Sequence, residues 1–376
     1  DFVFNNAKNL KKIESKYYSS LLKRKKKGAI SKGFNSARVA LDQLLVKENS
    51  SNGIYAGLPW FFQFWARDEA ISLKAVSLIG KNLTAKKTIL RLMNTIQSDG
   101  NIPNRIPPTD LGCADAVGWT FKRASQLMTN FLPLEKKLIK RKLYQSINSL
   151  LKNHTEDNLA MNGPQETWMD TVYQDDYRNG ARIEIQAMRL QMYQLMYKLS
   201  NQKIYRDLEL RLKKGVRDLF WNDKYLADGL GDWTIRPNLF IAYYVYPQLL
   251  SKEEWKTCFK FVLKHLWLDW GGLSTIEKHH PLFHENYSGE VPESYHRGDS
   301  WFWINNLAAI CLYKVDKKYF KNYIGKIIKA SLKEMLELGT IGCSAELSSS
   351  NELKSQGCLS QAWSSAMFIE LLKILD

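Results

Sequence analysis

The sequence is poor in residues that bind metals or form disulfides. Its five cysteines and six histidines are scattered over 376 residues, with no CxxC pair or other zinc-ligand spacing. The cysteines are Cys113, Cys258, Cys311, Cys343 and Cys358. An odd, dispersed set is typical of free thiols in a reducing compartment, so we predict a cytoplasmic protein without a metal site. His279, His280 and His284 do lie together, and a solvated loop explains them better than a metal site.

Long apolar segments and strand-like patterns are also missing. No run of about 18 apolar residues and no signal peptide occurs, which argues against a membrane anchor or secretion. No linker rich in Pro, Gly or Ser divides the chain. We therefore predict one domain over residues 34–376, preceded by a basic extension over 1–33. Since the chain begins with Asp1 and not Met, we expect that an upstream segment has been removed.

Positive charge and tryptophan are what the sequence has in excess. Lys and Arg total 54 against 38 Asp and Glu, a net charge of +16. Such an excess can serve nucleic-acid binding, but a nucleic-acid groove interleaves basic and aromatic residues. The densest basic run, Lys23–Lys27, lies far from every aromatic cluster, so we favour a solvated surface and no nucleic-acid partner. The 12 tryptophans suit stacking on pyranose rings, although a large core would also absorb several.

Apolar residues recur with a period near 3.6, which predicts about twelve α-helices. We place them at 34–48, 68–80, 84–97, 113–131, 133–153, 180–199, 203–221, 236–250, 251–267, 299–315, 317–337 and 357–375. Short turns and long loops alternate between these helices. Because short turns join antiparallel neighbours, all the long loops fall at the same end of the assembly. This pattern predicts an all-α fold, an (α/α)6 toroid of two concentric rings, and an open solenoid is the main alternative.

Long loops are usually functional, so we expect chemistry at their end of the fold. The first long loop leads into the sequence WARDEA, where Arg67 and Asp68 begin a helix close to Trp60 and Trp65. We interpret Asp68 as the N-cap of this helix. Adjacent Arg and Asp side chains also suit charge-assisted, bidentate hydrogen bonds to neighbouring sugar hydroxyls.

Carboxylates in two later loops are candidates for acid–base catalysis. Asp170 follows Trp168 by two residues, and an apolar ring against a carboxyl group raises its pKa, as proton donation requires. A general base must lie across the sugar and so come from a different loop. Glu346 and Glu352 both qualify by position. The acids clustered after Asp170 could instead bind calcium, but their spacing does not match an EF-hand.

Together, these segments resemble the amylo-α-1,6-glucosidase part of glycogen debranching enzymes, a relative of glucoamylases. The resemblance runs from about residue 53 to the C-terminus. The matching stretches, in the same order and spacing, are PWFFQFWARDEAISL, IPNRIP, ADAVGW, TWMD, RIEIQAM, IRPN, GGLST, YHRGDSWFW and GCLSQAW.

The resemblance implies an inverting hydrolase that needs no cofactor and releases glucose from α-1,6 branch stubs of glycogen or limit dextrin. It implies that Asp170 of TWMD is the general acid and that Glu346 is the general base. Glu184 lies in RIEIQAM and could be catalytic, substrate-binding or structural. The loops and the resemblance together give these substrate-binding candidates: Trp60, Trp65, Arg67, Asp68, Asp115, Trp119, Trp168, Arg236, His296 and Trp301.

Several positions depart from the family pattern. The family usually has Gly where this chain has Ala66, Gln where it has Arg297 and Thr where it has Asp299. These changes bear on linkage and chain-length preference more than on the chemistry. Stand-alone members carry an N-terminal β-sandwich, so we expect a removed domain or a partner subunit to supply one. Two alternatives remain: a glucoamylase- or trehalase-like exo-glucosidase on the same barrel, and a non-catalytic glycan-binding subunit.

Overall fold

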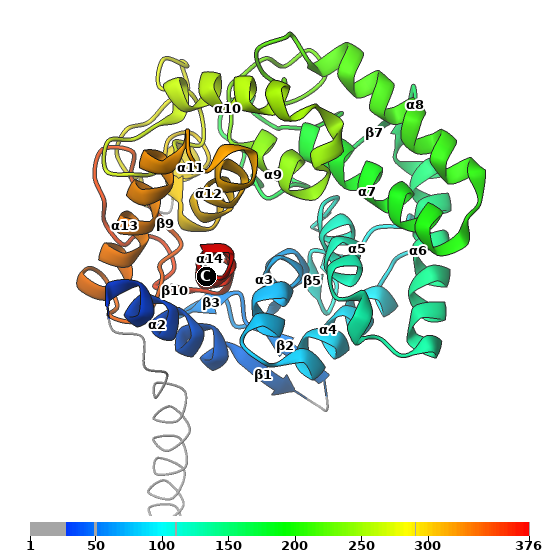
Figure 1. The fold of residues 1–376 in the computed structure, drawn as a ribbon, viewed down its shortest axis with the longest axis horizontal. Coiled ribbons are helices and arrows are strands. Elements are labelled where there is room, and N and C mark those ends of the chain that lie inside the picture. Colours follow the sequence, from blue (N-terminus) through cyan, green and yellow to red (C-terminus); the bar gives the residue numbers. More distant parts are fainter. Residues whose placement is uncertain (1–27, 49–50, 110, 290, 376) are drawn as a thin grey trace, which may run out of the picture.

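The computed structural model describes residues 28–48, 51–109, 111–289 and 291–375. Within them, twelve α-helices of eight residues or more alternate with loops and turns (Figure 1). They are α2 (Ala29–Gln43), α3 (Ala66–Leu78), α4 (Asn82–Asn94), α5 (Ala116–Gln126), α6 (Pro133–Asn153), α7 (Ile183–Ser200), α8 (Lys203–Phe220), α9 (Asn238–Val245), α10 (Lys252–Leu266), α12 (Phe302–Asp316), α13 (Lys321–Glu337) and α14 (Ala362–Leu375). Each corresponds to one helix that the apolar periodicity predicts.

Six of these helices form a closed inner ring. Each contacts the next in the order α3, α5, α7, α9, α12 and α14, and α14 contacts α3 again. Neighbours surround the inner helices, so these helices are buried on nearly all sides. In α12, every residue from Phe302 to Leu312 is buried. Figure 1 looks down the ring and shows the remaining helices outside it.

The other six helices cover the inner ring and bury only one face each. In α8 the buried residues are Tyr205, Glu209, Leu212, Val216 and Phe220. Their spacing of three or four residues forms a single stripe, while the rest of the helix meets water. α8 packs on α7, α4 on α3, α13 on α12 and α2 on α14. The (α/α)6 toroid predicted from the sequence is confirmed.

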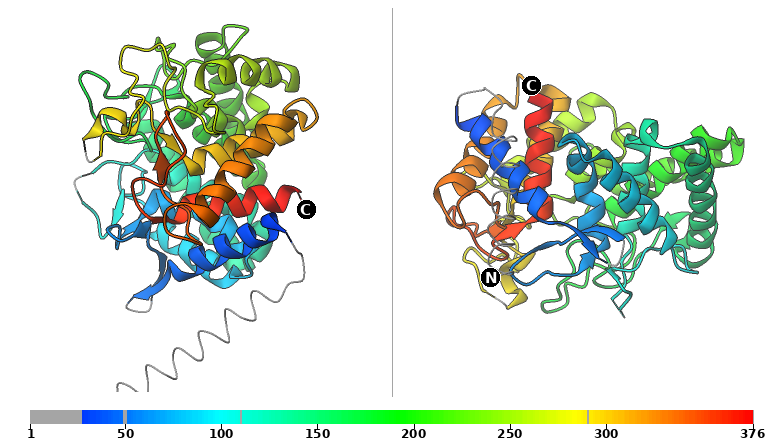
Figure 2. Two further views of the ribbon diagram at one scale, coloured as in Figure 1. Left: turned by 90° about the vertical axis from the view of Figure 1, so that its left-hand side faces the viewer. Right: turned by 90° about the horizontal axis from the view of Figure 1, so that it is seen from below.

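Short strands join the long loops to one another at one end of the toroid. β3 (Gly57–Leu58) pairs with β10 (Ser360–Gln361), so the first long loop meets the last. β4 (Phe64–Trp65) pairs with β5 (Arg105–Ile106), and β8 (Ser300–Trp301) pairs with β9 (Leu347–Ser348). The right-hand view in Figure 2 shows these loops gathered opposite the C-terminal end of α14. The pairings hold loops that are distant in sequence around one centre.

The first helix was predicted wrongly at both ends. It spans Ala29–Gln43, and the next residues form strand β1 (Leu45–Glu48), which pairs with β2 (Ser51–Ile54). Contacts made by the loop explain this ending: the carbonyl of Asn52 accepts a hydrogen bond from Arg91, and the amide of Ile54 donates to the Glu69 carboxylate. Short pairs of this kind leave no periodicity that could reveal them.

Two other predicted helices end earlier than expected, and part of the predicted N-terminal extension lies outside the described residues. The segment predicted as one helix at 113–131 breaks into α5 and a 3-10 turn at Met128–Asn130, and α9 ends at Val245 ahead of a second 3-10 turn at Pro247–Leu249. The remaining pair of short strands is β6 (Thr155–Glu156) with β7 (Leu159–Ala160). The basic run and most of the predicted extension over 1–33 lie outside the described residues, so that domain boundary stays a prediction. None of the helices that the structure describes is both long and apolar enough to cross a bilayer.

Candidate active site

A cavity of about 110 Å³ opens at the loop end of the toroid, at the N-terminal ends of the inner helices. Its walls come from the first, third, fifth and last long loops and from the first residues of α3 and α14. The lining residues are Ala56, Phe61, Trp65, Arg67, Asp68, Trp168, Asp170, Tyr295, Trp301, Glu346, Gln361 and Trp363. We call this space the inner pocket.

A larger cavity of about 430 Å³ adjoins the inner pocket. The two share Phe61, Tyr295 and Glu346 as lining residues. The larger one is also lined by Trp60, Thr171, Tyr287, Gly289, Pro292 and Gly357. We call it the outer chamber. Together they form a small compartment continuous with a wider one, and Glu346 lies at their junction.

Asp170 lies on the wall of the inner pocket, held by Arg67. Nη1 of Arg67 donates to Oδ2 of Asp170 at 3.0 Å, and its Nε lies 2.8 Å from both oxygens of Asp115. Burial raises the pKa of Asp170, an effect that the Arg67 guanidinium opposes. Since Arg67 occupies Oδ2, the Oδ1 atom is the one that can present a proton to a ligand.

Glu346 is 3% exposed, and hydrogen bonds hold both of its carboxylate oxygens. The hydroxyl of Tyr295 donates to Oε1 at 2.6 Å, and the amide of Cys358 donates to Oε2 at 2.8 Å. Burial raises the pKa of Glu346 to about 7, against the lowering effect of these two donors, and the nearby Asp170 raises it further. Both carboxyl groups therefore have raised pKa values, and that of Glu346 suits exchange of a proton near neutral pH.

The turn beside Glu346 requires glycine. Gly357 has a φ of +67°, and a Cβ built on it would lie 2.4 Å from Oε2 of Glu346. A side chain there would collide with the carboxylate and strain the backbone. The glycine thus leaves room for the carboxylate to accept the amide of Cys358.

Asp68 occupies the first turn of α3, whose N-cap is Trp65, so the prediction that Asp68 is the N-cap was wrong. Its carboxylate accepts a hydrogen bond from the side chain of Gln361 at 3.1 Å. Burial raises the pKa of Asp68 to about 8, and the Arg67 charge opposes that rise. The pair of Asp68 and Gln361 places a polar edge in a pocket that is otherwise largely aromatic.

Four indole rings line the inner pocket. Trp301 packs edge-to-face on Trp168 at 5.6 Å and on Trp363 at 5.7 Å. The indole N–H of Trp168 donates to Asn238, and that of Trp301 donates to the carbonyl of Tyr295. The indole nitrogens of Trp65 and Trp363 are buried without a hydrogen-bond partner. The four rings thus give the inner pocket apolar walls.

The structure brings seven of the sequence-predicted site residues to the inner pocket. They are Trp65, Arg67, Asp68, Trp168, Asp170, Trp301 and Glu346. Trp60 lines the outer chamber and is 53% exposed. Asp115 lies behind the wall, where it holds Arg67. Trp119 lies in the core against Tyr244 and Trp303, away from both cavities.

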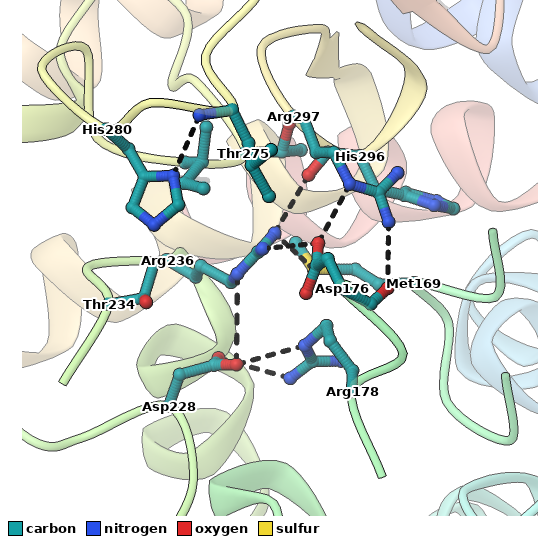
Figure 3. A network of polar contacts seen from close by, with 12 residues as sticks. Met169, Asp176, Arg178, Asp228, Thr234, Arg236, Thr275, His280, His296 and Arg297 are labelled. Atoms are coloured by element: carbon teal, nitrogen blue, oxygen red, sulfur yellow. Dashed lines mark hydrogen bonds and ion pairs between the residues drawn. The ribbon is translucent and has the colours of Figure 1, made fainter. Parts of the chain in front are cut away.

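Arg236 and His296 lie beside the pocket in the network of Figure 3 and line neither cavity. Arg236 donates to the carbonyl of His296 at 2.9 Å and to the carboxylate of Asp176 at 2.7 Å. The ring of His296 stacks on Trp301 at 5.1 Å and shares a hydrogen bond with the hydroxyl of Thr171. Burial, together with nearby arginines, lowers the pKa of His296 well below its usual value, so the ring is neutral.

Two carboxylates left open by the sequence lie away from the pocket. Glu352 is 52% exposed and pairs with Lys354, so of the two candidate bases only Glu346 reaches the cavity. Glu184 is fully buried and accepts two hydrogen bonds from Arg178, which also pairs with Asp228. This ion-pair cluster supports the loop that carries Trp168. In the described ranges no three His, Cys, Asp or Glu side chains form a group that could hold a metal ion.

Sequence reasoning missed five lining residues: Ala56, Phe61, Tyr295, Gln361 and Trp363. Gln361 and Trp363 belong to the QAW motif, Phe61 to the first aromatic motif and Tyr295 to YHRGDSWFW, so motif membership was a usable signal for those four. The fifth loop holds two tyrosines, Tyr287 and Tyr295, and nothing local marked Tyr295 as the one that lines the inner pocket. Ala56 gave no signal.

Paired carboxyl groups among tryptophans, at the loop end of a helical toroid, define a glycosidase-type protein. The family model described as amylo-alpha-1,6-glucosidase matches residues 39–370, and the chain belongs to this family.

Solved structures with this fold include several glycosidases. A wild-type glycosidase matches with a TM-score of 0.70 and 12% identity, over 92% of this chain and 97% of that chain. A GH63 mannosylglycerate hydrolase from Thermus thermophilus in complex with glucose matches with a TM-score of 0.65 and 12% identity, over 90% and 98%. An uncharacterized conserved protein from the same organism matches with 0.65 and 13%, over 89% and 98%. At these identities the likeness establishes the shared fold alone.

Proposed function

We propose that the chain is an inverting amylo-α-1,6-glucosidase that releases single glucose units from branch stubs of glycogen or limit dextrin. The observation that carries this proposal is the inner pocket, where Asp170 and Glu346 share one small, tryptophan-lined cavity with the Arg67–Asp68 pair. Family membership supports the same reaction class.

Asp170 would serve as the general acid. Burial raises its pKa, which favours the protonated form, and its Oδ1 would pass the proton to the glycosidic oxygen as the bond to the anomeric carbon breaks. Arg67 would hold the carboxyl group in place and stabilise the carboxylate that remains after proton transfer. Asp115 would keep Arg67 oriented through two contacts of 2.8 Å.

Glu346 would serve as the general base. As a carboxylate it would accept a proton from the water that attacks the anomeric carbon from the opposite face, which gives β-glucose from an α-linkage. The bonds from Tyr295 and Cys358 fix its orientation and stabilise its charged form. Its pKa of about 7 means that the ionised fraction, and with it the rate, rises as pH increases through neutrality.

The arrangement of the two cavities supports cleavage at the end of a chain. The terminal glucose would enter the inner pocket from the junction at Glu346 and contact the indoles and the Asp68–Gln361 pair. The outer chamber, about 430 Å³, would hold the rest of the substrate on Trp60 and Tyr287. The five cysteines, all free, support a reducing, cytoplasmic location.

Substrate profiling tests this proposal against its alternatives. The purified chain would be incubated with a limit dextrin bearing α-1,6-glucosyl stubs, with linear amylose and with trehalose, and released glucose would be measured. The proposal predicts release from the limit dextrin alone, with Glu346→Gln inactive. Release from amylose or trehalose would favour the broader exo-glucosidase. If none of the three yields glucose, a glycan-binding role on an inactive scaffold would be preferred.

A further inference from the structure

Arg297 makes an unusual set of contacts with the segment that follows the proposed acid. Its Nη2 donates to the carbonyl of Thr171 at 2.9 Å and to the carbonyl of Asp176 at 3.0 Å (Figure 3 shows Arg297 beside Asp176). Thr171 is the residue next to Asp170. One guanidinium nitrogen therefore binds the backbone at both ends of the turn 171–176, and this turn begins where the acid ends.

The rest of the guanidinium ties this turn to its surroundings. Nη1 donates to the hydroxyl of Thr171 at 3.3 Å and to the carbonyl of Pro292 at 3.1 Å. Nε lies 2.8 Å from Oδ2 of Asp176, the oxygen that also accepts from Arg236. These contacts join the acid-bearing loop to the loops that contribute Arg236 and Pro292.

The contact with Pro292 leads to the proposed base. Pro292 begins the short helix α11 (Pro292–Tyr295), and the hydroxyl of Tyr295 donates to Glu346 at 2.6 Å. A continuous path of bonded groups thus runs from Asp170 through Arg297 to Glu346. An inverting hydrolase depends on the separation of its acid and base, which must leave room for one water molecule.

Arg297 is well built to hold a fixed geometry. It is 1% exposed, so water does not compete for its donors. Its own backbone is held at both sides, because its amide donates to Ser294 and its carbonyl accepts from His284 at 2.7 Å. It lines neither the inner pocket nor the outer chamber, so any effect on catalysis must pass through other residues.

We propose that Arg297 is a positioning residue that holds the turn after Asp170 against α11 and thereby fixes the distance between the acid and the base. The proposal rests on the function proposed above. Glutamine, which the family usually carries here, offers two N–H donors where arginine offers five, and it has no charge for Asp176. Arg297 therefore makes more polar contacts with the acid loop than a glutamine could make.

Two variants and one matched control test the inference. Arg297→Met keeps an unbranched, mostly aliphatic stem and removes the guanidinium donors, and Arg297→Gln restores two donors without charge. The control is Arg217→Met, since Arg217 also bonds a carboxylate and a backbone carbonyl, those of Glu254 and Leu249, but lies on the outer ring. The substrates are a branched oligosaccharide with an α-1,6-glucosyl stub and α-glucosyl fluoride, whose leaving group departs as an anion and needs little help from an acid.

If the substitution displaces Asp170, kcat should fall more on the oligosaccharide than on the fluoride. Arg297→Met should lower kcat on the oligosaccharide ~10- to 100-fold, with KM changed less than ~3-fold, because a misplacement of about 1 Å costs that much rate. The loss of kcat on α-glucosyl fluoride should be much smaller than that on the oligosaccharide. On the oligosaccharide, the kcat of Arg297→Gln should lie between those of the wild type and Arg297→Met. Arg217→Met should keep the kcat of the wild type. If the Met variant does not fold, the Gln variant must still lose more activity on the oligosaccharide than on the fluoride.

Other outcomes overturn the inference or the proposed function separately. If Arg297→Met lowers the melting temperature but keeps kcat on both substrates, Arg297 is structural and the inference is wrong. The inference is also wrong if kcat falls by the same factor on both substrates. The same holds if Arg297→Gln matches the wild type on the oligosaccharide. If the wild type does not cleave the oligosaccharide, or if Asp170→Asn does not impair it, the proposed function itself fails.

Discussion

The hydrogen bond from Tyr295 to Glu346 should set the acidic limb of the pH profile. The phenol donates to Oε1 of the base at 2.6 Å, and this bond lowers the pKa of Glu346 against the effect of burial. Tyr295→Phe removes the donor and keeps the ring, which packs on Trp301 at 4.7 Å. Without the donor the charged form is less stable, so the pKa of Glu346 must rise above its present value of about 7.

The size of the shift follows from the strength of such bonds. A hydrogen bond to a charged group contributes about 1.5–3 kcal/mol. One pKa unit corresponds to about 1.4 kcal/mol, so the pKa of Glu346 should rise by roughly one to two units. Because the base acts when deprotonated, the acidic limb of kcat/KM should move to higher pH by the same amount. At pH 6 this lowers kcat/KM by about 10- to 100-fold.

The assay is glucose release from limit dextrin between pH 5 and 9, comparing the wild type with Tyr295→Phe. The control is Tyr225→Phe, whose hydroxyl donates to the carbonyl of Trp233 outside both cavities, and it should leave the profile unchanged. Since the two carboxyl groups interact, the limbs report the pair and not one residue alone. An acidic limb that stays in place, or moves to lower pH, would refute the assignment of Glu346 as the base.

Two further substitutions follow from the packing of the site. Gly357→Ala should lose ~1–2 kcal/mol of stability from its φ of +67° and most of its activity from the 2.4 Å clash with Glu346. Gly342→Ala is the matched control in thermal melts and activity assays: its φ is +91° but its Cβ meets nothing within 4 Å, so activity should survive. Asp115→Asn removes a charge that raises the pKa of Asp170, so the alkaline limb of the pH profile should move to lower pH. It also leaves Arg67 poorly paired, which should cost ~3–5 kcal/mol of stability in denaturant titrations, and an unmoved alkaline limb would contradict the acid assignment.

The helical frame was readable from the sequence because its pattern is strong. In an outer helix such as α8, the buried residues Tyr205, Leu212 and Val216 follow the helical period, so their spacing predicts the helix directly. The alternation of tight turns and long loops then placed all the loops at one end. The strand at 45–48 was not readable, because its pairing depends on contacts with Arg91 and Glu69 from other helices.

The sequence predicted which motifs contribute to the site, but not which side chains of each motif face the cavity. Trp119 and Trp168 both lie in matching motifs, yet the first faces the core and the second faces the pocket. Arg297 was noticed as a departure from the family, but its role depends on carbonyl groups in a loop more than a hundred residues earlier. A motif records which residues recur, whereas the direction of a side chain is set by packing between distant segments.

The configuration of the glucose first released tests the inverting mechanism directly. Proton NMR would follow limit dextrin during the first minutes of reaction, before mutarotation mixes the anomers. An inverting mechanism with this acid and this base releases β-glucose from the wild type, and Asp170→Asn and Glu346→Gln should release none. α-Glucose as the first product would contradict it, because net retention excludes Glu346 as a base that directs water to the opposite face.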